Sequence, residues 1–193
     1  MQSMGADDEA GLVARLRAGD TEAFDAVYDE YRPRIFGFLL RLSRRRAVAE
    51  DLLDETFLRL VRHVRRLRPD TNLGAWLFTV ARNLYWSYRR ASALEEEVDP
   101  AALSLWPITA PGPSPYELAA GGELESMFDH ALRALTAQQR EVLLLVIREG
   151  MKPSEAADVC GITAEALRQR LARARAALME HMNLERPVRR YGT

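Results

Sequence analysis

The sequence is poor in the residues on which most enzymes and exported proteins depend. Cys160 is the single cysteine among 193 residues, so no internal disulfide can form, and the three histidines show no zinc-ligand spacing with it. No nucleophile–base pair, metal constellation or phosphate-binding loop is present, which predicts a protein that is not an enzyme and needs no cofactor. No run approaches the roughly 18 apolar residues of a membrane span, and the acidic N-terminus lacks a signal-peptide core. We therefore expect a cytoplasmic protein without membrane insertion, in which Cys160 is a small buried hydrophobe.

Lysine is nearly absent as well, because Lys152 is the only one and arginine carries the remaining positive charge. The net charge of −1 would argue against a nucleic-acid partner, but the charges are segregated along the chain. No Lys or Arg occurs from residue 91 to residue 130, where the charged residues are acidic. The arginines form four blocks: 41–46, 59–68, 82–90 and 168–175.

Strand-like alternation is also missing, and apolar residues recur at helical spacing, which predicts an all-α fold of two small helical domains. The proline-rich and glycine-rich stretch between them predicts a flexible acidic linker, which is either simply solvated or a mimic of a nucleic-acid strand. The expected segments are an N-terminal extension (1–19), a first helical domain (20–91), the linker (92–122), a second helical domain (123–182) and a tail (183–193).

A helix from about residue 49 to residue 67 is predicted to have one apolar and one acidic face. Its packing face is formed by Ala49, Leu52, Leu53, Thr56, Phe57 and Leu60. Its outer face, a candidate docking surface for a basic partner, is formed by Glu50, Asp51, Asp54, Glu55 and Leu58. A second explanation stays open, because acids in a first helical turn and arginines later in a helix are favoured by the helix dipole.

The next predicted helix, from Leu73 to about Arg90, places aromatic and cationic residues on its outer face. We expect Trp86 to be exposed, with Phe78 on the same side, and an exposed indole among arginines can stack on an unpaired base. In the alternative, Trp86 packs against the linker or the other domain. The candidate single-strand-binding residues, including the loop before the helix, are Asp70, Thr71, Asn72, Arg82, Asn83, Trp86, Arg89 and Arg90.

The second domain has the signals of a helix-turn-helix. Thr136 and Gln139 form a capping box, Pro153 begins a short helix, Gly161 makes a turn, and Thr163 caps a long basic helix. The face predicted to pack carries Leu167, Leu171, Ala174 and Leu178. The residues expected to contact bases or phosphates of duplex DNA are Glu165, Arg168, Gln169, Arg170, Arg173 and Arg175.

Three segments together resemble the extracytoplasmic-function sigma factors, group 4 of the sigma-70 family. These are the run from Ala49 to Leu60, the run from Ala75 to Leu84, and the segment from Leu135 that continues to Arg175. Departures from the family pattern include Asp54 in place of a common Gln and Glu165-Ala166 in place of a common Gly-Thr.

The resemblance implies a sigma region 2 bundle and a region 4 helix-turn-helix that bind core RNA polymerase and direct promoter-specific initiation. It assigns the acidic face to the polymerase clamp coiled coil, region 4 to the flap and the minus-thirty-five element, and the Trp86 face to the minus-ten element, with Asn83 beside a flipped base. It also implies an anti-sigma factor and a linker that threads a polymerase channel. The alternative is a stand-alone helix-turn-helix regulator that binds duplex DNA without polymerase.

Overall fold

All regular structure in the described part of the chain is helical, as predicted. The computed structural model describes residues 6–96 and 123–184. The chain divides into two units between Ala110 and Pro111, inside the predicted linker, whose residues 97–122 lie outside the described ranges. Each unit has its own core and is described by itself.

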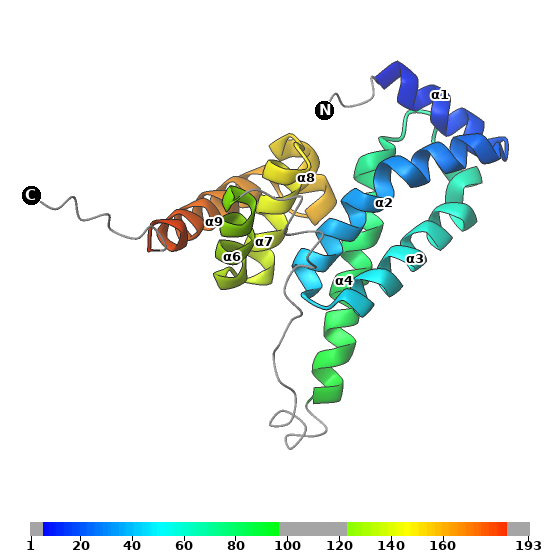
Figure 1. The fold of residues 1–193 in the computed structure, drawn as a ribbon. Helices are drawn as coiled ribbons and strands as arrows, with labels where there is room; N and C mark the ends of the chain where they lie inside the picture. Colours follow the sequence, from blue (N-terminus) through cyan, green and yellow to red (C-terminus); the bar gives the residue numbers. More distant parts are fainter. Residues whose placement is uncertain (1–5, 97–122, 185–193) are drawn as a thin grey trace, which may run out of the picture. The chain divides into compact units, whose positions relative to one another are not determined.

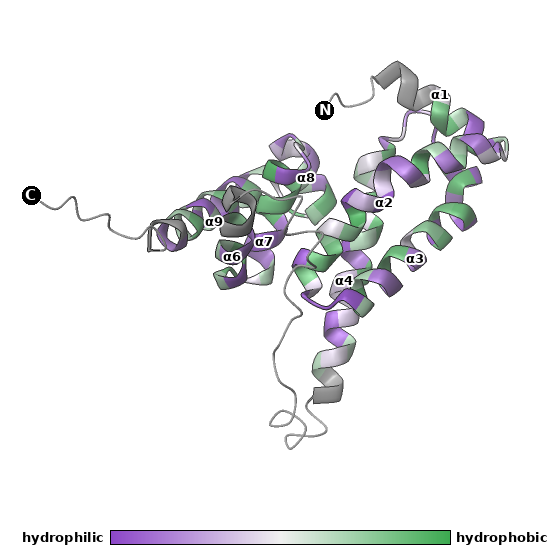
Figure 2. Cartoon of the chain, in the orientation of Figure 1, coloured by the Kyte–Doolittle hydropathy of each residue, from purple (hydrophilic) through white to green (hydrophobic). Residues whose placement is uncertain are grey.

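The first unit is built on three helices that pack against one another: α2 (Thr21–Ser43), α3 (Arg46–His63) and α4 (Leu73–Glu96) (Figure 1). The short 3-10 helix η1 (Val64–Arg66) follows α3. Figure 2 shows hydrophobic and hydrophilic residues alternating along α2 and α3, as expected for helices with one packed face. The largest fully buried side chains of this unit are those of Ile35, Phe38, Leu39, Leu60, Leu73, Leu77 and Phe78.

A further helix, α1 (Ala6–Arg17), lies in the predicted N-terminal extension, where no element was expected. It packs on α2 and η1 through Leu12, Val13 and Leu16, all of which are buried. The spacing of these three residues is helical. The helix is short, however, and its first turn is acidic and not apolar, so the sequence shows too few apolar repeats to predict it.

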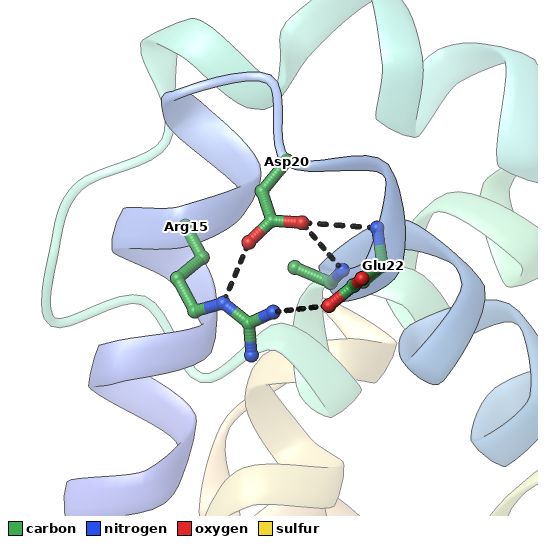
Figure 3. A network of polar contacts seen from close by, with 4 residues as sticks. Arg15, Asp20 and Glu22 are labelled. Atoms are coloured by element: carbon green, nitrogen blue, oxygen red, sulfur yellow. Dashed lines mark hydrogen bonds and ion pairs between the residues drawn. The ribbon is translucent and has the colours of Figure 1, made fainter.

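The junction between α1 and α2 is held by a polar network (Figure 3). Asp20 caps α2, because its Oδ1 accepts hydrogen bonds from the backbone N–H of Glu22 (2.9 Å) and of Ala23 (3.2 Å). Its other oxygen accepts from Arg15 Nε at 2.7 Å, and Arg15 also lies 3.8 Å from Glu22. The hydrogen bond from Arg15, followed by those from the backbone amides, holds the pKa of Asp20 below its ordinary value.

Helix α4 approaches α2 closely at its start and runs further than predicted at its end. A Cβ atom added to Gly74 would lie 3.0 Å from Tyr31 Oη, so glycine permits this approach. The helix continues to Glu96 and not to about Arg90, which makes the first five residues of the predicted linker helical. Residues 91–96 contain alanine, leucine and glutamate, which favour helix, and the first proline comes only at residue 100.

The second unit contains α6 (Glu123–Ala134), α7 (Ala137–Leu143), the π-helical turn η3 (Leu144–Arg148), α8 (Pro153–Cys160) and α9 (Ala164–Leu184). Helix α9 packs against α6, α7 and α8. The capping box of Thr136 and Gln139 is present as predicted, and Gly161 has the left-handed φ of 63° that the turn requires.

Buried polar groups join α6 to α7. Arg140 is 5% exposed and donates to the carbonyl oxygens of Leu132 (2.9 Å) and Leu135 (2.8 Å). Leu132 lies in the last turn of α6, where its carbonyl also accepts from the N–H of Leu135 at 3.2 Å, and Leu135 directly follows the helix. Arg140 therefore caps the end of α6 from within the core. Cys160 is buried, as expected.

Within residues 6–96 and 123–184, no helix has both the length and the apolar character needed to cross a membrane.

Candidate protein- and nucleic-acid-binding surfaces

Helix α3 separates its two faces as the sequence predicted. All six residues of the expected packing face are buried: Ala49, Leu52, Leu53, Thr56, Phe57 and Leu60. The hydroxyl of Thr56 donates to the carbonyl oxygen of Leu52 at 2.7 Å, which satisfies the one polar group on this face. The other face is therefore available for a partner.

The acids of the outer face are not explained by the helix dipole. Helix α3 begins at Arg46 and has no acid in its first turn, whereas the favourable dipole effect falls off within that turn. Two acids are neutralised locally, since Glu50 pairs with Arg46 (2.8 Å) and Glu55 pairs with Arg59 (2.9 Å). Both pairs are in contact with solvent, the first exposed and the second half-buried, and such pairs contribute little to stability.

Asp51 and Asp54 are exposed, and neither forms an ion pair with another described residue. Beside them, Leu58 is 48% exposed and Val61 is 56% exposed. Their spacing of three, four and three residues places all four on one side of α3. We call Asp51, Asp54, Leu58 and Val61 the acidic–apolar patch. Val61 was missed in the sequence, although its position three residues after Leu58 would have identified it.

The outer face of α4 differs from the prediction at two residues. Phe78 is fully buried, because its ring packs edge-on against Phe38 with centroids 5.4 Å apart. Trp86 is half-buried where exposure was expected, since its ring lies 5.3 Å from that of Tyr85. The guanidinium of Arg89 lies 5.9 Å from the Trp86 ring centroid. The prediction for Phe78 was wrong, and that for Trp86 was partly so.

The other predicted residues of this face remain accessible. Asn83, Arg89 and Arg90 are exposed and Arg82 is half-buried, with Arg82 Nη1 donating to Asn83 Oδ1 at 3.0 Å. Trp86 lies among these side chains on the same helix face. A partly exposed indole can stack on an unpaired base, and the guanidinium groups that flank it can bind the phosphates.

The loop before α4 is ordered by its own side chains. Arg68 donates to both carboxylate oxygens of Asp70, each at 3.0 Å. The Oδ1 atom of Asn72 accepts from the backbone N–H of Ala75 at 2.7 Å and so caps α4, while Thr71 is half-buried. Asp70 and Asn72 therefore have structural contacts that the sequence prediction did not assign to them.

The long helix of the second unit exposes the residues predicted to face DNA. Its packing residues Leu167, Leu171, Ala174 and Leu178 are buried, as expected. Thr163 caps it by accepting from the N–H of Ala166 at 3.1 Å. Five of the residues predicted to contact DNA are exposed: Glu165, Arg168, Gln169, Arg173 and Arg175. The sixth, Arg170, is half-buried.

Glu165 organises the start of this helix. It accepts hydrogen bonds from Arg168 Nε and from Gln169 Nε2, each at 3.1 Å. The bond from Arg168, and then that from Gln169, lowers the pKa of Glu165. Gln169 and Arg168 are thus held in position before any DNA binds.

Over the described residues, no group of three or more His, Cys, Asp or Glu side chains could hold a metal ion.

Two segments of the chain match known protein families. Residues 27–94 match Sigma-70 region 2, and residues 125–178 match Sigma-70, region 4. Helix α1 lies before the first matched segment.

Curated relatives agree with these matches. The chain is 34% identical over 146 residues to the ECF RNA polymerase sigma factor EcfG of Rhodopseudomonas palustris, which covers 76% of this chain and 77% of the relative. It is 33% identical over 166 residues to the RNA polymerase sigma factor CarQ of Myxococcus xanthus, which covers 86% and 92%. Two further relatives are longer, and the chain spans only 56% and 42% of their length.

The fold is similar to that of the sigma factor RpoE from Bartonella quintana, which was solved in complex with the anti-sigma factor NepR. The TM-score is 0.71 at 29% identity, and the match covers 84% of this chain and 98% of that chain.

Proposed function

Because this chain belongs to the extracytoplasmic-function sigma factors of the sigma-70 family, we propose that it binds core RNA polymerase and directs initiation at specific promoters. In this role the polymerase carries out the chemistry, and the chain supplies binding surfaces. Each surface described above has one task in the proposal.

The acidic–apolar patch of α3 docks on a basic partner surface, the clamp coiled coil of the polymerase. Asp51 and Asp54 carry charge that no described residue neutralises, and Leu58 and Val61 offer apolar area that docking would bury. Glu50 and Glu55 border the patch but are already paired within α3, so we assign them a smaller share of the attraction.

The outer face of α4 captures the unpaired strand of the minus-ten element. Trp86 is the stacking platform, and the nearby cations hold the backbone. The residues assigned to this element remain Asp70, Thr71, Asn72, Arg82, Asn83, Trp86, Arg89 and Arg90.

Helix α9 reads the minus-thirty-five element in the major groove. Gln169 can make two hydrogen bonds to adenine, and Arg173 can do so to guanine. Arg168, Arg170 and Arg175 are placed to contact phosphates. Glu165 can accept a hydrogen bond from cytosine, or it can hold Arg168 and Gln169 in position. Its contacts favour the second role.

One observation carries the proposal. The same chain has an exposed helix-turn-helix reading face and, in a separate unit, an exposed acidic–apolar patch that a simple duplex-binding regulator would not need. A relative whose structure was solved with an anti-sigma factor supports a restraining partner of that kind for this chain also.

Run-off transcription tests the proposal. Purified core polymerase is incubated with the chain and a library of genomic fragments, and the transcripts are sequenced; we expect starts that share two upstream elements. A chain with Asp51→Arg and Asp54→Arg is the control and should give no such starts. If the wild-type chain binds duplex DNA tightly by itself but never directs initiation, the stand-alone regulator is the correct function.

A further inference from the structure

The arginine block at residues 59–68 has no task in the proposed function. Three of its five arginines lie close to acids, at 2.9–3.8 Å: Arg59, Arg62 and Arg68. The other two, Arg65 and Arg66, are exposed in η1 and form no ion pair with any described residue. These two charges are therefore available to an anionic partner.

The helix dipole does not account for Arg65 and Arg66. It favours cations within the last turn of a helix, and the last turn of α3 already holds Arg62 and His63. The two arginines follow that turn, in a helix of only three residues. Because a macrodipole is a sum over aligned peptide units, η1 by itself contributes little.

Helix α1 packs on η1 and adds a third cation. Arg17 lies in the last turn of α1, is exposed and forms no ion pair within the described part of the chain. Its neighbour Arg15 differs, because Asp20 holds it at 2.7 Å. We call Arg17, Arg65 and Arg66 the η1 basic patch. Since α1 precedes the segment that matches Sigma-70 region 2, that segment alone does not supply the whole patch.

The patch adjoins the loop that the proposed function assigns to the minus-ten element. Leu67 is buried and its N–H donates to the carbonyl oxygen of Val64 at 3.2 Å, which holds the end of η1 in place beside the loop. Asp70 follows Arg66 by four positions, and four residues span at most about 14 Å. A stacked DNA strand rises about 3.4 Å per nucleotide, so about four nucleotides cover this distance. A strand bound at the loop therefore brings its phosphates within reach of the patch.

We propose that the η1 basic patch binds backbone phosphates of the promoter strand that α4 captures. The proposal rests on the proposed function of the α4 face. Guanidinium groups match the geometry of phosphate oxygens, and the patch offers them without acids that would repel DNA. The contact is to the backbone, so it adds affinity at every sequence and specifies none. An acidic protein surface is the other occupant that charge alone would allow, and the salt dependence of DNA binding distinguishes the two.

Paired substitutions separate charge from fold. Arg65→Ala with Arg66→Ala removes two phosphate contacts, whereas Arg65→Lys with Arg66→Lys keeps both charges. These positions are exposed, so circular dichroism melting should give the wild-type Tm for both variants. Arg32→Ala with Arg46→Ala is the matched control, since it removes the same charge from exposed positions of α2 and α3.

The measurement is the salt dependence of binding to a forked DNA of fixed sequence, half duplex and half single-stranded. The full chain is titrated between about 50 and 200 mM salt. Each phosphate contact adds about 0.7–0.9 to the slope of log K against log salt, so the alanine variant should have a slope shallower by roughly 1.4–1.8. Its loss of affinity over this fourfold range of salt should then be smaller than that of the wild type by roughly 7-fold to 12-fold. The lysine variant should keep the wild-type slope, and the control should change it far less than the alanine variant does.

Equal slopes for the alanine variant and the control would overturn the proposal, because only overall charge would then matter. A lysine variant with the shallow slope of the alanine variant would also refute a phosphate contact, since a retained charge still displaces counterions. An unchanged slope with weaker binding to core polymerase would make the patch a protein contact, and a wild-type chain that does not bind the fork at about 50 mM salt would overturn the proposal outright. Failure of the proposed function looks different: the wild-type chain would not support run-off transcription, whatever the salt slopes show.

Discussion

Reversing the charge of the acidic–apolar patch should strongly weaken binding to core polymerase and leave the fold intact. Asp51→Arg with Asp54→Arg changes two exposed side chains that pair with no described residue. Substitutions at such positions alter the free energy of unfolding by about 0.5 kcal/mol or less each. Against a basic partner, each reversal replaces an attraction by a repulsion. We expect a combined cost of about 3–4 kcal/mol, or roughly 100-fold to 1000-fold in Kd.

The apolar part of the patch should contribute less. Leu58 is 48% exposed, so docking can hide only about half of its side chain. Full burial of a leucine is worth about 1.5–3 kcal/mol, and Leu58→Ala should therefore weaken binding by about 1 kcal/mol, or roughly 5-fold. Glu55→Arg should have a smaller effect than either aspartate, because Arg59 already neutralises Glu55.

Fluorescence titration of labelled chain with core polymerase measures these affinities, and circular dichroism melting checks the fold. Asp25→Arg with Asp29→Arg is the matched control, since it makes the same charge change at two exposed positions of α2. Wild-type affinity in the double variant would refute the docking assignment. Equal losses in the control and the double variant would show that net charge, and not this patch, governs binding.

Three further predictions concern other parts of the chain. Trp86→Ala should weaken binding to single-stranded DNA by about 1–3 kcal/mol while Trp86→Phe keeps most of the affinity, as measured by fluorescence anisotropy; equal losses would argue against stacking. Arg140→Met leaves the carbonyl of Leu135 without its guanidinium donor, while the carbonyl of Leu132 keeps only the N–H of Leu135. It should destabilise the second unit by about 1–3 kcal/mol in urea denaturation, whereas a neutral result would mean that water replaces the guanidinium. The pKa of Asp20 is lowered in the folded state, so ionised Asp20 stabilises the fold above the ordinary aspartate pKa, and this stabilisation is lost as the pH falls through the lowered pKa. The Tm difference between wild type and Asp20→Asn should therefore be present at neutral pH and vanish in acid. A constant difference would contradict the assigned cause.

Much of this architecture could be predicted because its signals are local. The capping box at Thr136, the turn at Gly161 and the regular apolar spacing of α3 each specify a helix boundary or face within a few residues. The acidic side of α3 followed directly from that spacing. At these places the local sequence was sufficient to predict the structure, because no tertiary contact opposes the local conformational preference.

The features that could not be predicted depend on tertiary contacts. Phe78 lies at the border of the apolar sector of α4, and only its packing on Phe38 decides that it is buried. The left-handed backbone of Arg44 leaves no trace in the sequence, which has no glycine there. Helix α1 is stabilised by docking on α2 and η1 more than by its own propensity.

The loop before α4 keeps hydrogen-bonding capacity for a nucleotide. Both oxygens of Asp70 accept from Arg68, and the amide oxygen of Asn72 accepts from the N–H of Ala75. Each of these oxygens keeps a second lone pair, so Asp70 and Asn72 can still accept, and Asn72 also keeps the two N–H donors of its amide. A nucleotide that reaches Asn72 can therefore offer an acceptor, such as a purine N7, a carbonyl oxygen or a phosphate, or a donor, such as the exocyclic amine of a cytosine. The cap on α4 thus fixes the Asn72 side chain in one orientation and leaves both kinds of hydrogen bond open to a base.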